Sequence, residues 1–135
     1  MSRPEILNLF ERSDWVELPL EEDSSFDYYD KDDSGNPDPE NKIYYAVDGN
    51  IVSIRGVVTP KKEIAGSAST IPIVKLPDEI VPDGTINQVC QGTNKNTWLL
   101  GIDANNNLSF SRYGITGFEK CSPGNWLPFS FTYRI

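Results

Sequence analysis

The chain has 135 residues, a net charge of −8 at pH 7 and 38% hydrophobic residues, which is typical of one folded domain able to bury a core. No apolar run approaches the ~20 residues that a membrane span requires, and Met1–Glu5 lacks the apolar core of a secretory signal peptide. We therefore expect a protein that folds in water and is not exported by that route.

The negative charge is concentrated in one segment. Residues 14–40 hold 11 of the 20 acidic residues and only Lys31 on the basic side, a local charge of −10. The rest of the chain carries 9 acidic and 11 basic residues, a charge of +2. Because neither a basic stripe nor a basic amphipathic helix is present, we expect neither nucleic acid nor a membrane as a partner.

Residues 2–12 are predicted to form a short helix, with Ser2 as the N-cap and Glu5 completing a capping box. A helix this short is unstable in water unless its apolar stripe is covered. The cover is either the rest of the domain or another chain, and we interpret the apolar side chains of this region as a handle for assembly into a homo-oligomer. These side chains are Ile6, Leu9, Phe10 and Trp15.

Residues 15–20 alternate like an edge strand, and residues 21–41 are predicted to be a long acidic loop. Phe26, Tyr28 and Tyr29 interrupt this loop with aromatic side chains, which argues against full disorder. The sequence thus divides into an N-terminal helix and acidic loop over residues 1–41 and a β-domain over residues 42–135.

Residues 43–58 are predicted to be a β-hairpin rich in β-branched and aromatic residues. Asp48-Gly49 breaks the run and suits the positive φ angles of a primed turn. In the second strand Val52, Ile54 and Val58 share one face, and Gly56 lies on that face too. A glycine there predicts a bulge or a close approach of another group.

Further strands are expected within residues 70–77, 97–103, 108–112 and 127–135, with a hairpin tip at 104–107. The last of these alternates with period two up to Ile135. About seven or eight short strands at regular spacing favour an all-β fold, and we predict an antiparallel β-sandwich.

Catalysis is not expected. The chain has no histidine, which removes the Ser-His-Asp and Cys-His nucleophile systems and the commonest metal ligand. Neighbouring carboxylates occur mainly in the acidic loop, where a fixed separation between two groups is hard to maintain. Cys90 and Cys121 are expected to be free, buried thiols, with a single disulfide as the alternative.

One motif has the pattern of a calcium loop. Oxygen-bearing side chains occupy its positions 1, 3, 5 and 9, and Gly35 stands at position 6, where the loop turns. The pattern fails at position 12, which is Asn41 rather than glutamate, and no flanking helices are predicted. An ordinary acidic turn and a calcium site both remain open for the candidate ligands, which are Asp30, Asp32, Ser34 and Asp38.

Several aromatic side chains could stack on sugar rings, since an aromatic face with a polar tip suits that contact. The alternative is that they belong to the core or to an interface. These residues are Tyr28, Tyr29, Tyr44, Tyr113 and Trp126.

Five segments occur in a fixed order along residues 43–135: DGNIVSIRGVV (48–58), IPIVKLP (71–77), Val81-Pro82, NNL (106–108) and FSFTY (129–133). This order of strands and turns resembles the β-sandwich domains of tail, baseplate and receptor-binding proteins of siphophages that infect Gram-positive bacteria. This resemblance implies a virion protein of the tail tip that takes part in host adsorption. Its partners would be other tail or baseplate subunits and further copies of itself, with recognition of cell-wall polysaccharide as a further role. A calcium-dependent carbohydrate-binding module of a cell-wall-active system is the alternative function.

Overall fold

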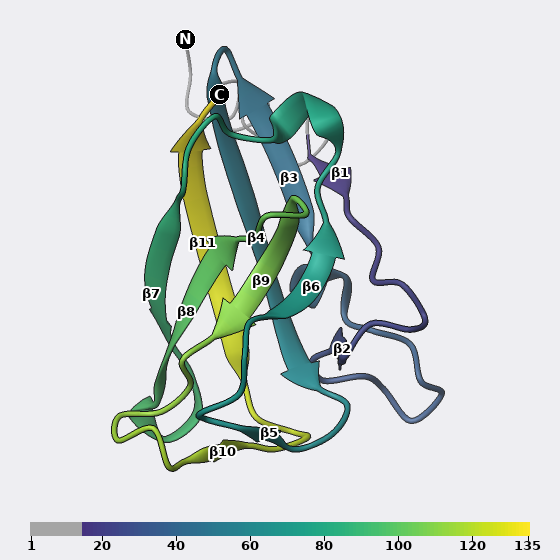
Figure 1. The fold of residues 1–135 in the computed structure, drawn as a ribbon. Coiled ribbons are helices and arrows are strands. Elements are labelled where there is room, and N and C mark those ends of the chain that lie inside the picture. Colours follow the sequence, from purple (N-terminus) through teal and green to yellow (C-terminus); the bar gives the residue numbers. More distant parts are fainter. Residues whose placement is uncertain (1–14) are drawn as a thin grey trace, which may run out of the picture.

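The computed structural model describes residues 15–135, which form two main antiparallel β-sheets (Figure 1). The expected helix over residues 2–12, with Ile6, Leu9 and Phe10, lies outside the described residues. The first sheet has the order β1-β3-β4-β11, and β2 also pairs with β4; the second has the order β6-β9-β8-β7; β10 pairs with β5 in a small third sheet. The strands are β1 (Val16–Glu17), β2 (Phe26–Tyr28), β3 (Tyr44–Asp48), β4 (Ile51–Pro60), β5 (Ile64–Ala65), β6 (Ile71–Lys75), β7 (Asn87–Gln91), β8 (Thr97–Ile102), β9 (Asn107–Ser111), β10 (Lys120–Cys121) and β11 (Leu127–Arg134).

The all-β prediction is confirmed, whereas the expected number of strands was too low, since residues 15–135 contain eleven. The four unexpected strands are β2, β5, β7 and β10. Three of them have only two or three residues, too few to show an alternating pattern, and β7 is largely polar. Within the described part of the chain, the helical segments are single 3₁₀ turns such as η2 (Pro39–Asn41), η3 (Asp78–Ile80) and η4 (Thr93–Lys95), and none could span a bilayer.

The hairpin of β3 and β4 forms the centre of the first sheet. Asp48 pairs with Ile51, so Gly49 and Asn50 make a two-residue turn. Gly49 has a φ of 63°, as expected for the first central position of a type II′ turn. A primed turn is therefore present, one residue later than the predicted Asp48-Gly49 pair, and it places Ile51–Arg55 of β4 between β3 and β11.

Side chains of β4 alternate strictly between the interior and the outer face. Gly56 is an interior position that pairs with Phe129 of β11. An ideal Cβ at this glycine would lie 2.8 Å from Ile43 Cγ1 and 3.0 Å from Phe129 Cζ. The predicted close approach is confirmed, and the register with β11 continues through the glycine without a bulge.

Aromatic rings connect the inner faces of the two main sheets. Phe26 of β2 contacts Phe110 of β9, with ring centroids 5.4 Å apart, and Trp98 of β8 meets Phe129 of β11 edge-on at 6.1 Å. Each of these side chains is buried. Residues 16–28 thus contribute to the same core as the hairpin and the C-terminal strand, since β1 and β2 pair with β3 and β4.

Two strand edges carry devices that limit pairing with another sheet. In β6 the register shifts between Pro72 and Val74, so Ile73 and Val74 are both buried at successive positions. In β11 the carbonyl of Ser130 accepts a 2.8 Å hydrogen bond from the side-chain amide of Gln88. Gln88 belongs to β7, the edge strand of the second sheet. Pro128 also lies in β11, the edge strand of the first sheet, and has no N–H that could pair with a further strand.

Candidate functional site

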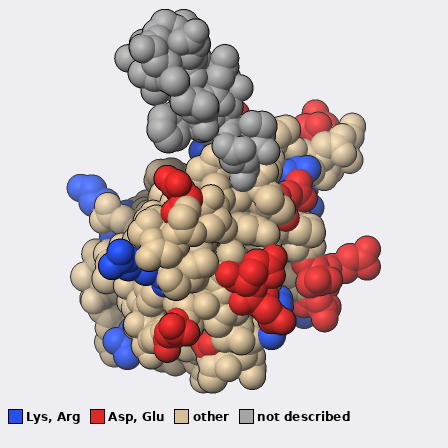
Figure 2. All heavy atoms as spheres, turned by 90° about the horizontal axis from the view of Figure 1, so that it is seen from above, with Lys and Arg blue, Asp and Glu red and all other residues tan. Residues whose placement is uncertain are grey.

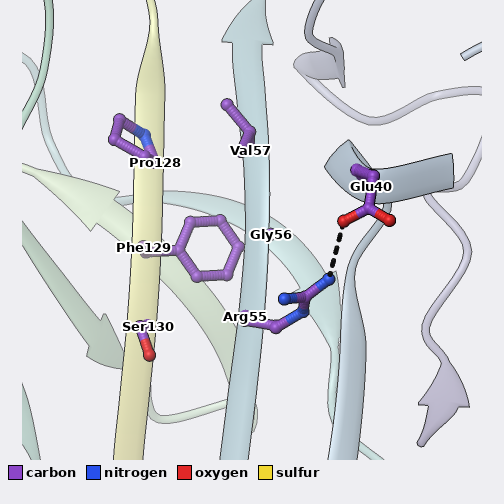
Figure 3. A pocket seen from close by; sticks show the side chains of 7 residues that line it. All are labelled: Glu40, Arg55, Gly56, Val57, Pro128, Phe129 and Ser130. Carbon is purple, nitrogen blue, oxygen red and sulfur yellow. Dashed lines mark ion pairs between the residues drawn. The ribbon is translucent and has the colours of Figure 1, made fainter. Parts of the chain in front are cut away.

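A groove lies on the outer face of the first sheet, between β11, β4 and η2 (Figure 3). We call it the outer groove. Its volume is about 360 Å³, within the lower part of the range of small-ligand pockets, which is roughly 300–1,000 Å³. It is lined by Glu40, Arg55, Gly56, Val57, Pro128, Phe129 and Ser130.

Strand alternation determines which groups reach this groove. Arg55 and Val57 point outward from β4, and Pro128 and Ser130 point outward from β11. Gly56 and Phe129 face the interior and can contribute only their backbone to the outer face. The groove therefore has an apolar part at Val57 and Pro128 and a polar part at the other end.

Arg55 is held on the side of the groove away from β11. Its guanidinium Nη2 lies 3.8 Å from Glu40 Oε2, and its Cζ stands 5.7 Å from the centre of the Trp15 ring. Figure 3 shows the Arg55 side chain directed toward Glu40 rather than toward Ser130. Because the opposite neighbours on β11 are short, the sheet surface between the two strands stays open.

η2 positions Glu40. Asp38 Oδ1 accepts a 2.9 Å hydrogen bond from Glu40 N and so caps this turn, and Pro39 supplies its rigid first residue. The hydroxyl of Tyr44, an outward residue of β3, donates to the carbonyl of Pro39 at 3.1 Å. The acidic segment is thereby attached to the sheet next to the groove.

The groove combines an apolar surface with a cation and an anion on one wall. Such an arrangement suits the binding of an apolar side chain flanked by charges, or of a ligand with an apolar face and hydroxyl groups. The groove could not be identified from the sequence. Two short outward residues of β11, Pro128 and Ser130, lie beside the long Arg55 side chain of β4. This pattern could have indicated the groove, but it can be recognised only when the β4–β11 register is known.

Two of the four candidate calcium ligands, Asp32 and Asp38, already accept local hydrogen bonds through their side chains. Asp32 Oδ1 accepts from the backbone N–H of Ser34 and of Asn36 at 2.9 and 2.8 Å. Asp38 caps η2, and Asp30 has a φ of 60°. Among residues 15–135, no group of three or more His, Cys, Asp or Glu side chains is arranged to hold a metal ion. The calcium site stays a prediction from the sequence.

Acidic side chains are unevenly distributed over one face of the molecule. Figure 2 shows the largest group of Asp and Glu side chains on one side of the view, further acidic side chains elsewhere on this face, and Lys and Arg side chains on both sides. Among the described residues, three ion pairs involve the acidic segment of residues 14–40: Lys31–Asp27 at 2.6 Å, Lys42–Glu17 at 3.3 Å and Arg55–Glu40.

The aromatic residues considered for sugar stacking have different environments. Tyr113 is buried, stacks on Phe110 and accepts hydrogen bonds from Asn96 and Asn125, so the stacking role is wrong for this residue. Tyr28, Tyr29 and Tyr44 are half-buried on or beside the first sheet. Trp126 is exposed at the opposite end of β11 from the chain terminus. Of the four candidate assembly residues, Trp15 packs against Arg55 of its own chain.

Cys90 and Cys121 are free and buried, as expected. Burial raises the pKa of each thiol to about 11, although hydrogen bonds from Gln88 and Asn125 act in the opposite direction. Both side chains are therefore protonated at neutral pH, and they serve as small core residues.

Comparison with protein-family models, with curated proteins and with solved structures found no match to this chain.

Proposed function

We propose that the two main sheets form a β-sandwich and that the protein is a non-catalytic structural component of a bacteriophage tail tip or baseplate. It would act in host adsorption by assembling with other tail subunits and with copies of itself, and its loops would contact cell-wall polysaccharide. Its location would be the virion.

The observation that carries this proposal is the resemblance of residues 43–135 to siphophage tail domains. The segments that carry the resemblance lie in the longer strands: DGNIVSIRGVV covers the turn and most of β4, IPIVKLP covers β6, and FSFTY lies in β11. The outer groove is compatible with assembly through surface patches, because it places an apolar recess beside the Arg55–Glu40 ion pair.

Immunogold electron microscopy tests the virion role. Purified particles of the phage that carries this coding sequence would be labelled with antibodies against the full chain, and we expect label at the tail tip. Absence of the protein from purified, infectious particles would overturn the proposal. A variant lacking residues 1–15 is a second arm: reduced incorporation supports the N-terminal region as an assembly handle, and normal incorporation argues against it.

Saccharide recognition is tested separately with purified Gram-positive cell-wall polysaccharide. We expect binding that persists in the presence of a chelator. Binding that is lost on chelation, in a protein absent from virions, would instead favour the calcium-dependent carbohydrate-binding module.

A further inference from the structure

The outer face of the second sheet carries small side chains along its two central strands. Gly101 of β8 pairs directly with Ser109 of β9, and Leu99 pairs with Ser111 in the neighbouring row. These four are outward positions, since the residue between each two of them along a strand belongs to the buried core. A glycine inside a central strand often marks the close approach of another group or of a ligand.

These small side chains leave a pocket of about 380 Å³ on this face, which we call the hydroxyl pocket. Its volume lies in the lower part of the range of small-ligand pockets, which is roughly 300–1,000 Å³. The lining comes from β7, β8 and β9 and from segments next to the strands. Its polar members are Thr70, Asn87, Asp103, Ser109, Ser111 and Arg112.

Most of these polar groups are not used by the fold itself. Within residues 15–135, no hydrogen bond or ion pair engages the side chains of Thr70, Asn87, Ser111 and Arg112. Ser109 is only 4% exposed, and its hydroxyl donates to Gly101 O at 3.2 Å, which leaves its lone pairs as acceptors. Amides and hydroxyls both donate and accept hydrogen bonds, so the pocket matches a ligand that is rich in hydroxyls.

Gly101 allows the Asn87 amide to lie at the pocket. Asn87 is on the edge strand β7 and pairs with Gly101. An ideal Cβ at this glycine would overlap Asn87 Oδ1, so any other residue at position 101 would displace the amide. The amide therefore lies over the glycine, beside the hydroxyl of Ser109 on the next strand.

Arg112 supplies a cation at a fixed place in the chain. It follows β9 directly and has a φ of 53°, which is uncommon for a residue with a side chain. The next residue, Tyr113, is buried, and Gly114 N donates to Thr97 O of β8 at 2.8 Å. The backbone around Arg112 is thus attached to the second sheet on both sides.

The carboxylate of the pocket does not neutralise this cation. Asp103 Oδ1 accepts from the backbone N–H of Asn105 and of Asn107, each at 2.9 Å, and Oδ2 accepts from Asn107 Nδ2 at 3.2 Å. Asp103 is therefore engaged in its own turn, and the charge of Arg112 is available to an anionic group of a ligand.

This chemistry fits a sugar with a carboxylate better than other ligands. The ring hydroxyls of a sugar pair with amides and hydroxyls, and a carboxylate pairs with a guanidinium through two parallel hydrogen bonds. A phosphate site usually combines several cations or backbone N–H donors, whereas this pocket has one cation. An extended peptide would pair with the edge of a sheet rather than with its face.

We propose that the hydroxyl pocket binds a sugar residue that carries a carboxylate. Arg112 would bind the carboxylate, and Asn87, Ser111 and Thr70 would bind ring hydroxyls. The proposal rests on the proposed function only for the source of this sugar, which would be an acidic residue of cell-wall polysaccharide. It assigns that contact a surface on the second sheet and a class of sugar.

Nuclear magnetic resonance titration of the full chain with methyl glucuronide and methyl glucoside tests the proposal, since these probes differ only in the carboxylate. We expect shifts confined to the amides around Gly101 and Ser111. The glucuronide should bind at least about tenfold more tightly, because hydrogen bonds between charged groups are stronger than those between neutral ones.

Three variants separate the roles of the pocket residues. Arg112→Gln should lower the affinity for the glucuronide to that for the glucoside. Asn87→Ala should weaken both probes by a similar factor, because it removes a contact to hydroxyls. Arg134→Gln is the matched control, since it removes the same charge from an exposed position on β11 outside the pocket. Circular dichroism melting verifies that each variant folds.

No binding of the glucuronide, equal affinity for both probes, or an unchanged affinity in Arg112→Gln would overturn the proposal. Inorganic phosphate that shifts the same amides and binds as tightly as the glucuronide would also overturn it. The virion role is judged separately by immunogold labelling. A chain that is present in virions but does not bind the glucuronide refutes only the pocket, whereas a chain that binds it but is absent from virions refutes only the virion role.

Discussion

Gly56→Ala should destabilise the fold through a single added methyl group. The new Cβ would lie 2.8 Å from Ile43 Cγ1 and 3.2 Å from its Cα, and 3.0 Å from Phe129 Cζ. Ile43 is fully buried and Phe129 nearly so, so neither side chain has space to withdraw. β4 cannot shift easily at Gly56, because it pairs with β11 through this residue and with β3 up to the adjacent Arg55. Overpacking of this kind costs about 1–3 kcal/mol.

For a domain of this size, that loss lowers the melting temperature by roughly 3–5 °C per kcal/mol. Calorimetry and urea unfolding of the parent and the variant measure the effect. Gly84→Ala is the control, because Gly84 has no heavy atom within 4 Å of its ideal Cβ and no positive φ. We expect this control to be neutral or slightly stabilising. A Gly56→Ala variant whose unfolding free energy stays within about 0.5 kcal/mol of the parent would refute the packing argument.

Removal of residues 129–135 deletes three inward aromatic side chains, and burial of each contributes roughly 1.5–3 kcal/mol to stability. Because the free energy of unfolding of a typical domain is only about 5–15 kcal/mol, this truncation should abolish folding. An unchanged melting transition would contradict the role of β11. Millimolar calcium should leave the melting temperature unchanged, and a rise of several degrees that Asp30→Ala/Asp32→Ala removes would establish the site. Because burial raises the pKa of Cys90 and Cys121 from 9.0 to about 11, the folded state retains these protons longer than the unfolded state. Stability should be constant with respect to these groups below pH 9 and decrease between pH 9 and about 11, and Cys90→Ala/Cys121→Ala should flatten that decrease in urea unfolding curves.

The sequence by itself determined the longer strands and the turns between them. Alternation in residues 127–135 and the glycine of the Gly49-Asn50 turn are local signals, because side-chain direction repeats every two residues and a two-residue turn needs a positive φ. The close approach at Gly56 could also be predicted, since a glycine on a buried strand face leaves space that a neighbour fills.

Only the tertiary structure decided which surfaces meet and which stay open. The outer groove depends on the β4–β11 register, which places Arg55 opposite Ser130, and on η2, which brings Glu40 to Arg55. Tyr113 looks like an exposed loop aromatic in the sequence but is buried, because partners distant along the chain enclose it. Phe118 looks like a core residue but is exposed, because its loop is folded by hydrogen bonds of its own. Burial in a β-protein is set by non-local pairing, and residue type alone does not reveal it.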